Sequence, residues 1–292
     1  VFQIIENADT AILALQNGEV DAYQMTPQQV KKLDLDASNL STYSYSEGRV
    51  GYLEINCNRV TDEKVRKALL YAMDRKAMDD AAFESSEYYS IPYTFLPTNS
   101  QFYTEDGVEK YEQDVDKAKS MLEDAGVSGL KLKLGYMSSD AVQSAQALLI
   151  QEQLKEVGVT VELAGGDGTA IANAMKDPDN EYDMYLGGYI MGIDPDTFSS
   201  LFENDGAYNY MHYSGYDTID QLFEEGRSKL DESARKETYA KLQAAVQDTG
   251  AFYPIISNNK ILVVNNRIQG VEDAGLVPVY TFEDTSSLKI AE

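Results

Sequence analysis

The spacing of apolar and polar residues along the chain predicts helices and strands that alternate. The first residues, 1–5, and residues 20–23 are expected to be strands, and residues 8–16 a helix that stops before Gly18. A second helix is expected to begin at Thr26-Pro27, because proline suits the first turn of a helix. The chain is therefore predicted to begin with a strand-helix-strand-helix fragment.

A longer helix is predicted after Thr61, the expected N-cap, because apolar residues then recur at helical spacing. These residues are Val65, Ala68, Leu69, Ala72 and Met73. Residues 86–106 are rich in Tyr, Pro, Ser and Thr and show no periodicity, so we expect an ordered loop there. Long loops inside compact proteins often carry function.

The middle of the chain has the pattern of a parallel crossover unit. A helix is predicted at 114–125, a strand at 130–136, a helix from Asp140 to Val157 and a strand at 159–163. A strand, a long helix and a second strand usually form a right-handed parallel unit. The sequence therefore predicts an α/β protein.

The last third of the chain is predicted to add one strand, three helices and a hairpin. The strand covers 182–189, the first helix opens at Asp194, and two more helices lie within 218–247. Residues 252–264 have the pattern of a β-hairpin that turns at Asn258-Asn259.

Composition and charge exclude several classes of function. The chain has 292 residues, 43% of them hydrophobic, which is enough for a substantial core. Its 24 basic and 49 acidic residues give a formal net charge of −25, and this field repels nucleic acid and anionic lipid headgroups. We expect neither partner. No stretch has the length or pattern of a membrane span or a signal peptide. Cys57, the single cysteine, lies in an apolar run and is expected to be a buried thiol.

The strongest candidate for a ligand site follows the strand 182–189. Open α/β sheets bind ligands beyond the carboxyl ends of their strands, where glycines let a ligand approach the backbone. Gly188 to Asp194 is therefore a candidate rim, with Tyr189 at the end of the strand. The alternative is that Asp194 only caps its helix and that Tyr189 only packs.

Other motifs are weaker. Gly165-Gly166-Asp167-Gly168-Thr169 resembles the nucleotide-binding signature of diacylglycerol and NAD kinases, but a strand-to-helix turn is the better interpretation. The acidic residues of 177–183 lack the glycine and glutamate of a calcium loop, so a solvated acidic turn is favoured. His212 is the only histidine, and a packed or surface role is favoured over a catalytic one. We expect no catalytic residues, no metal site and no cofactor.

Several segments resemble, in the right order, the extracellular solute-binding proteins of the dipeptide, oligopeptide and nickel family of ABC importers. The segments are Ala11 to Asp21, Val65 to Arg75 (Val-Arg-Lys-Ala-Leu-Leu-Tyr-Ala-Met-Asp-Arg), Tyr111 to Gly126, and Tyr182-Asp183-Met184 through Asp194-Pro195. Together they cover nearly all of the chain.

The resemblance implies a two-lobed protein that closes over a ligand and delivers it to a membrane permease. It implies a periplasmic-binding-protein-like type II lobe, a mixed sheet flanked by helices, at residues 58–256. Residues 1–57 would be a remnant of the first lobe, to which residues 257–292 return. The resemblance also implies an extracytoplasmic location, ABC permease subunits as partners, and a membrane link only through a lipid anchor absent from this chain. With one wall of the cleft missing, the chain is expected to bind feebly.

The resemblance places the ligand-binding residues at the cleft strand and the loops beside it. We expect them to be Tyr185, Gly188, Tyr189, Gly192, Asp194 and Asn209. Peptide-binding members usually carry Trp where this chain has Tyr189, and Asp where it has Gly192. An oligopeptide-like solute is therefore the first expectation, with Asp194 accepting hydrogen bonds from it. An oligosaccharide or another solute, and a nucleotide-dependent kinase, are the alternatives.

Overall fold

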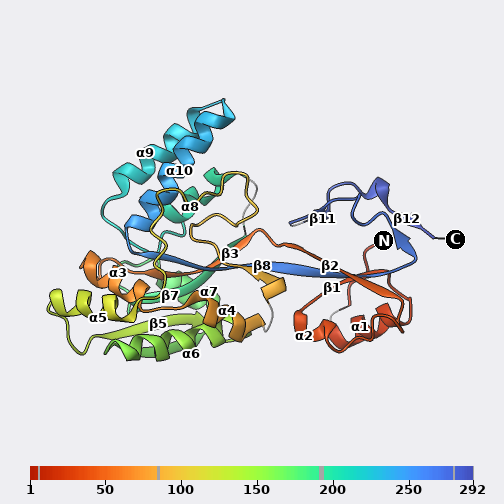
Figure 1. Ribbon diagram of the computed structural model, residues 1–292, viewed down its shortest axis with the longest axis horizontal. Helices are drawn as coiled ribbons and strands as arrows, with labels where there is room; N and C mark the ends of the chain where they lie inside the picture. The colour runs from red at the N-terminus through yellow and green to blue at the C-terminus, as the bar shows by residue number, and fades with distance from the viewer. Residues whose placement is uncertain (6, 84–85, 191–193, 279, 292) are drawn as a thin grey trace. The chain divides into compact units, whose positions relative to one another are not determined.

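The computed structural model describes residues 1–5, 7–83, 86–190, 194–278 and 280–291 (Figure 1). The chain forms two compact units. The first unit comprises Val1–Glu47, Glu87–Tyr89 and Asn258–Glu292, and the second comprises Gly48–Ser86 and Ser90–Ser257. The predicted boundaries instead lie after residues 57 and 256. The assignment of the units to two lobes stays a prediction.

The sheet of the second unit is mixed and has the strand order β6-β5-β7-β3-β8. Next to the edge strand β6 (Thr160–Gly166), the strand β5 (Lys131–Met137) runs parallel to β6 and to β7 (Met184–Ile190). By contrast, β3 (Arg49–Ile55) runs antiparallel to β7 and to the first part of β8 (Phe252–Asn265). These pairings hold β3 in the second unit.

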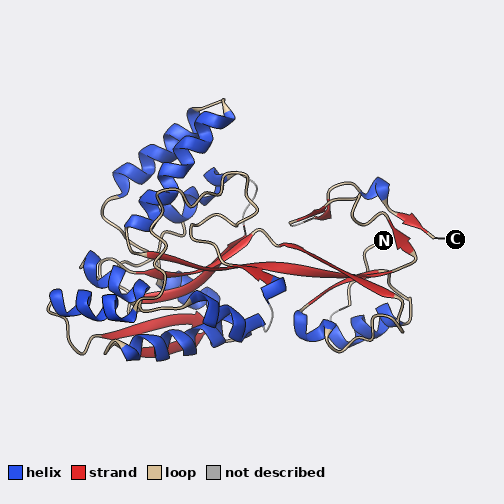
Figure 2. Ribbon diagram, in the orientation of Figure 1, coloured by secondary structure: helices blue, strands red, loops and turns tan. Residues whose placement is uncertain are grey.

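The predicted parallel crossover is confirmed. Between β5 and β6 the chain forms α6 (Ala141–Glu156), and the Asp140 side chain accepts hydrogen bonds from the amides of Val142 and Gln143. Figure 2 shows helices on both sides of the sheet, with α6 on one side and α8 to α10 on the other. The predicted α/β fold, a mixed sheet flanked by helices, is therefore confirmed.

The remaining elements of the second unit are mostly short helices. They are α3 (Glu63–Tyr71), α4 (Arg75–Phe83), α5 (Val115–Asp124), α7 (Gly168–Ala174), the 3₁₀ turn η2 (Pro195–Phe198), α8 (Ser199–Phe202), α9 (Tyr216–Ser228) and α10 (Glu232–Asp248). The turn η1 (Ser86–Tyr88) and the strand β4 (Tyr89–Ser90) lie where the chain passes between the units.

The stripe of apolar residues predicted after Thr61 is buried, but the helix begins one residue later than expected. Asp62 is the N-cap, because its side chain accepts a hydrogen bond of 2.8 Å from the amide of Lys64. The helix α3 then ends at Tyr71, so Ala72 and Met73, the last two residues of the predicted stripe, follow it, and a separate helix, α4, starts at Arg75. All five residues of the stripe are less than a tenth exposed.

An aromatic core fills the space between the sheet and α8 to α10. Phe95 lies 5.0 Å from both Phe198 and Phe202, ring centre to ring centre, and Phe202 lies 5.0 Å from Phe252. Phe95 and Phe102 come from the long loop, which Thr94 ties to Gln243 by a hydrogen bond of 2.8 Å. The expectation of an ordered loop is therefore confirmed.

The first unit packs helices against a small antiparallel sheet. Both β1 (Ala22–Met25) and β2 (Leu40–Ser46) pair with the second part of β8, and α1 (Ala8–Gln16) has the predicted bounds. The capped helix α2 (Pro27–Val30) also begins as predicted. The short elements of the C-terminal part are β9 (Ile268–Gln269), β10 (Leu276–Val277), β11 (Thr281–Phe282), η3 (Thr285–Ser287) and β12 (Lys289–Ile290).

The predicted hairpin at 252–264 is wrong, because β8 is one continuous strand (Figure 2). Residues before Asn258 pair with β3, and residues after it pair with β2. The carbonyl of Asn258 accepts a hydrogen bond from the amide of Glu47 at 3.1 Å. Because β2 and β3 supply the hydrogen-bond partners, the two halves of β8 do not need to fold back on each other. In addition, Asn-Asn lacks the glycine that tight hairpin turns favour.

The predicted strand at 1–5 is also wrong. Within the described residues nothing pairs with this segment, and Val1, Phe2 and Ile4 are almost fully exposed. A strand is stable only when a neighbour accepts its ladder hydrogen bonds, so apolar β-formers alone do not make one.

Candidate ligand-binding site

The candidate rim lies where β3 and β7 form their last paired positions. Val50 is opposite Tyr189, Gly51 is opposite Gly188, and Arg49 is opposite Ile190. Because side chains alternate along strands, Tyr185 and Tyr189 project from one face of the sheet and Gly188 from the other. The Tyr189 face carries the aromatic core, whereas the Gly188 face at this end carries Arg49.

Tyr189 is half-buried at the edge of the aromatic core. Its ring centre lies 6.3 Å from that of Phe198 and 5.8 Å from that of Tyr208, and its hydroxyl is 3.0 Å from Ser200 Oγ. Tyr208 is 42% exposed. The two tyrosines therefore combine flat apolar surface with polar tips at the end of β7, a combination suited to a mixed ligand.

Tyr185 lies deeper along the same face. Its ring makes an edge contact with Tyr210 at 5.6 Å between centres, and it stands opposite Glu54 in the β3–β7 ladder. Burial, with a smaller contribution from Glu54, raises the pKa of Tyr185 to about 12. The hydroxyl stays protonated near neutral pH and can donate a hydrogen bond.

Sequence reasoning missed Glu54. The residue is fully buried, and neither carboxyl oxygen has a hydrogen-bond partner among the residues that the structure describes. Burial raises the pKa of this carboxyl well above its ordinary value. Burial thus favours the neutral form of this carboxyl beside Tyr185. The available signal was one charged residue inside the apolar run Gly51 to Cys57.

Asp194 is placed at the rim, but its carboxylate is already engaged. It caps η2 by accepting a hydrogen bond from the amide of Asp196 at 3.0 Å. Nη2 of Arg235 lies 2.8 and 2.7 Å from its two oxygens, and this contact raises the pKa of the Arg235 guanidinium. Both contacts favour the capping role that the sequence analysis gave as the alternative.

Asn209 supports its surroundings in a similar way. Its amide nitrogen donates to the Glu203 carbonyl at 3.0 Å, and its amide oxygen accepts a hydrogen bond from the Tyr216 hydroxyl at 2.6 Å. The residue is buried and follows Tyr208 directly. These bonds fix the backbone that carries the exposed Tyr208 ring.

Gly188 does not present an open approach to the backbone. A side chain there would place its Cβ atom 1.9 Å from Nη2 of Arg49, so the guanidinium of Arg49 occupies that space. Arg49, which sequence reasoning also missed, is half-buried. Gly192, the remaining predicted site residue, lies outside the described residues.

The weaker motifs have local structural roles. Gly165 and Gly166 end β6, and Asp167 caps α7 by accepting a hydrogen bond from Ala170, which is the predicted strand-to-helix turn. His212 Nε2 lies 2.8 Å from the Met175 carbonyl oxygen.

The solvated acidic turn was only partly correct. Asp177 and Asp179 are exposed, but Asp183 is buried, because it pairs with Arg59 at 2.7 Å and accepts from the amide of Lys133 at 2.7 Å. The buried state of Cys57 is confirmed.

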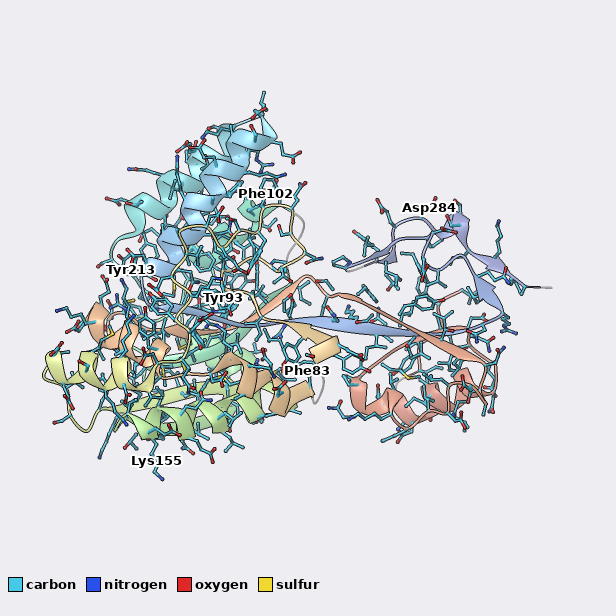
Figure 3. The ribbon with its side chains drawn as sticks, in the orientation of Figure 1. Phe83, Tyr93, Phe102, Lys155, Tyr213 and Asp284 are labelled. Carbon is cyan, nitrogen blue, oxygen red and sulfur yellow. The ribbon has the colours of Figure 1, made fainter. Side chains whose placement is uncertain are left out.

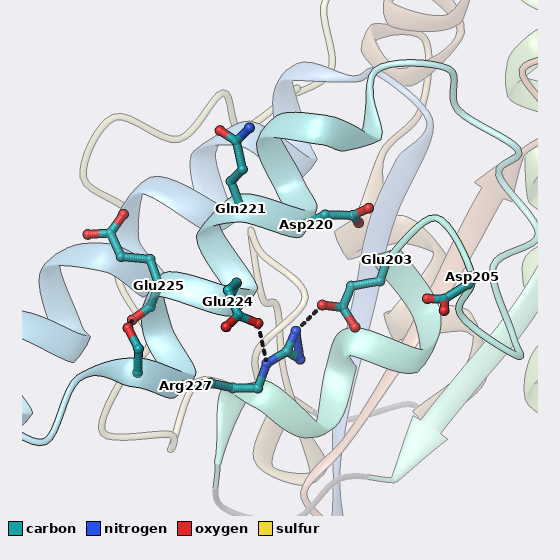
Figure 4. A pocket seen from close by; sticks show the side chains of 8 residues that line it. Glu203, Asp205, Asp220, Gln221, Glu224, Glu225 and Arg227 are labelled. Atoms are coloured by element: carbon teal, nitrogen blue, oxygen red, sulfur yellow. Dashed lines mark hydrogen bonds and ion pairs between the residues drawn. The ribbon is translucent and has the colours of Figure 1, made fainter.

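A hollow of about 640 Å³ lies along α9 and not at the candidate rim. Figure 4 shows Arg227 pointing between Glu203 and Glu224, with further carboxylates around it. Within the described ranges, no group of three or more potential ligands could hold a metal ion, and no helix is long and apolar enough to cross a membrane.

The fold is that of known ABC transporter substrate-binding proteins. The chain superposes over its whole length on CtaP of Listeria monocytogenes with a TM-score of 0.92 and 37% identity, covering 60% of that protein. It superposes over 99% of its length on a putative peptide-binding protein, AppA, of Clostridium difficile with a TM-score of 0.89 and 33% identity, again covering 60% of that chain.

Sequence comparison identifies the family. A family profile, described as bacterial extracellular solute-binding proteins, family 5 middle, matches residues 1–210, and the chain therefore belongs to this family. The oligopeptide-binding protein AppA of Bacillus subtilis is 25% identical over 91% of this chain and 52% of its own length. The chain thus spans about half the length of the curated relatives it matches.

Proposed function

We propose that this chain is part of the substrate-binding component of an ABC importer, which captures an oligopeptide-like solute outside the cytoplasmic membrane. Membership of the solute-binding family supports the class of function, and the names of relatives support a peptide ligand. ABC permease subunits would receive the loaded protein. The residues 1–57 and 257–292 would then belong to one lobe and 58–256 to the other.

The observation that carries this proposal is the pair of tyrosines at the end of β7. Tyr189 and Tyr208 have ring centres 5.8 Å apart, and the aromatic core supports Tyr189 from behind. Two rings held in place lose little freedom on binding, so they can stack against a planar peptide group or an apolar side chain. Tyr185 extends the same face with a further hydrogen-bond donor.

In this proposal Asp194 and Asn209 position the rim and do not bind the ligand themselves. Asp194 is paired with Arg235, and Asn209 has its amide oxygen and nitrogen both bonded. A ligand that displaced either contact would have to replace it with an equal one. The proposal therefore places the binding energy on Tyr189 and Tyr208.

A comparison of two substitutions at one position tests the proposal. Binding of a randomised tetrapeptide pool and of maltohexaose is measured for the wild-type chain by native mass spectrometry and calorimetry. Tyr189→Ala removes the ring, and Tyr189→Phe keeps it while losing the contact with Ser200. We expect tetrapeptide binding to fall about tenfold or more in Tyr189→Ala and to change little in Tyr189→Phe.

Thermal unfolding of each variant shows whether it is folded at the temperature of the binding assay. Equal peptide affinity in wild type and Tyr189→Ala would refute the stacking role of Tyr189. Retention of maltohexaose in place of peptides would favour the oligosaccharide alternative.

A further inference from the structure

Arg49 differs from the other arginines because no described residue forms a hydrogen bond or an ion pair with it. Among the described residues, the other six arginines each donate a hydrogen bond to a backbone carbonyl or a carboxylate. For Arg49 the same residues provide neither a hydrogen bond nor an ion pair. This is unexpected in a chain with 49 acidic and 24 basic residues, where a carboxylate is seldom far away.

The guanidinium of Arg49 lies on a floor made by two glycines. Gly51 and Gly188 face each other across β3 and β7, on the same side of the sheet as Arg49. A Cβ atom on Gly188 would come 1.9 Å from Nη2 and 2.2 Å from Cζ, and one on Gly51 would come 3.5 Å from Nη1. The absence of both side chains thus lets the guanidinium rest directly on the backbone.

This position fixes the guanidinium at the end of the ladder that carries Tyr189. Arg49 pairs with Ile190, the last residue of β7, and Ile190 is 49% exposed. The positive charge of Arg49 lowers the pKa of Tyr52 on β3 and of Tyr185 on β7, although burial has the larger effect and raises both pKa values. A half-buried cation therefore stands at the end of this ladder, on the face of the sheet opposite Tyr189, where a solute that crosses the ends of the two strands would meet it.

Acidic groups on these strands and at the rim have other partners or project from the other face of the sheet. Asp194 is paired with Arg235, and Asp196 is paired with Arg227 at 3.1 Å. Glu54 lies on the same strand as Arg49. Side chains alternate along a strand, and residues 49 and 54 differ by an odd number, so the Glu54 side chain projects from the opposite face. Burial also favours the neutral form of Glu54.

We infer that Arg49 recognises a carboxylate of the bound solute. A guanidinium offers a planar set of donors that matches the two oxygens of a carboxylate. The inference rests on the proposed function and specifies its ligand: the group that meets this rim is anionic. The sequence analysis expected the opposite kind of ligand group, one that donates hydrogen bonds to the carboxylate of Asp194. The carboxylate belongs either to the C-terminus of a peptide or to an acidic side chain.

The net charge of the chain makes this preference a discriminating one. A formal charge of −25 repels anionic ligands at long range, so the overall field favours peptides without a carboxylate. A measured preference for a carboxylate must therefore come from a local cation. If the preference is lost when Arg49 is replaced, that cation is Arg49.

The test uses three pools of tetrapeptides with acetylated N-termini and no basic residues. The first pool has a free C-terminal carboxylate, the second a C-terminal amide, and the third a C-terminal amide with one internal glutamate. We expect the wild-type chain to bind the first or the third pool about 10- to 100-fold more tightly than the second. The pool that is preferred shows whether the carboxylate is terminal or on a side chain.

Three variants and a matched control assign the preference. Arg49→Met is expected to lose the preference while keeping the affinity for the amidated pool, and Arg49→Lys to keep part of it. Gly188→Ala leaves the charge but pushes the flexible guanidinium off its floor, so it should also reduce the preference. Lys155→Met removes the same charge from the outer side of α6 (Figure 3) and should leave the preference unchanged.

The outcomes separate this inference from the function on which it rests. If no pool binds to the wild-type chain, the proposed function fails. If the pools bind with equal affinity, or if Arg49→Met weakens the carboxylate and amide pools alike in a folded protein, the function stands and the role of Arg49 is wrong.

Discussion

The carboxylate of Asp194 accepts two hydrogen bonds from Nη2 of Arg235, at 2.8 and 2.7 Å, while it caps the turn η2. One side chain thus links the end of the candidate rim to the helix α10. The relationship gives an acidic residue at a predicted binding site a structural role, and in the proposed function the tyrosines and Arg49, not Asp194, meet the ligand.

Substitutions of Asp194 separate its two contacts. Asp194→Ala removes both the cap and the ion pair, and we expect it to lower the free energy of unfolding by about 1–2 kcal/mol. Asp194→Asn keeps a good cap and loses the charge, so it should cost less than about 1 kcal/mol. Urea denaturation measures both. A loss of peptide binding in the folded Asp194→Asn variant would show that Asp194 binds the ligand after all.

The buried carboxyl of Asp79 should make stability depend on pH. Burial raises its pKa from 3.8 to about 9, so the folded chain keeps a proton that the unfolded chain releases. This contribution to stability is complete below about pH 4 and is lost as the pH rises toward 9, with a slope of up to about 1.4 kcal/mol per pH unit. Glu54 contributes in the same direction, because burial also raises its pKa.

Asp79→Asn should therefore reduce the pH dependence and stabilise the chain at neutral pH relative to wild type. Denaturation between pH 5 and pH 8 measures the slope, and Asp124→Asn, at an exposed helix end, is the control. An unchanged slope in Asp79→Asn would mean that this carboxyl is ionised in the folded chain.

Gly226→Ala should destabilise the chain although alanine is the better helix former. A Cβ atom at this buried position of α9 would come 2.6 Å from Tyr239 Cζ, and Tyr239 on α10 is itself fully buried. The overpacking is expected to cost about 1–3 kcal/mol, more than the gain of about 1 kcal/mol from helix propensity. Ser228→Ala, on an exposed turn of the same helix, should be nearly neutral. Higher stability of Gly226→Ala in thermal unfolding would contradict this prediction and show that α9 and α10 can move apart enough to accommodate the added methyl group.

The thiol of Cys57 should be unreactive in the folded chain. The side chain is buried, and burial raises its pKa to about 11, so little thiolate is present or accessible at pH 8. We expect the reaction with Ellman's reagent to be about 100-fold slower or more in buffer than in 8 M urea. A fast reaction of the native chain would place Cys57 on a segment that opens readily.

Much of the secondary structure of the second unit could be predicted because its signals are local. Asp114 and Asp140 lie next to the helices they cap, and the apolar stripe of α3 repeats within a few residues. The crossover from β5 to β6 follows from one strand, one helix and one strand in succession. Motifs in these same segments also carried the resemblance to the solute-binding family.

The strand β8 could not be predicted in the same way. Its apolar run and its two asparagines have the local pattern of a hairpin, but its pairing partners, such as Ser46 for Asn259, lie far away in the sequence. The first residues present the converse case, because Val1 to Ile5 have β-forming side chains and no partner in the described chain. Strand pairing is a long-range choice, and local propensity does not encode it.

The sequence by itself determined the fold class and the family, because caps, periodic stripes and the segments that resemble the family are each formed by a few neighbouring residues. It also predicted a candidate rim after the strand 182–189. Only the tertiary structure decided what the rim residues do. Asp194 meets Arg235 from a position 41 residues away, Arg49 comes to lie on Gly188, and Glu54 is buried without a partner. These roles depend on which distant side chains fold next to one another, and charge and burial at a site are set by those neighbours.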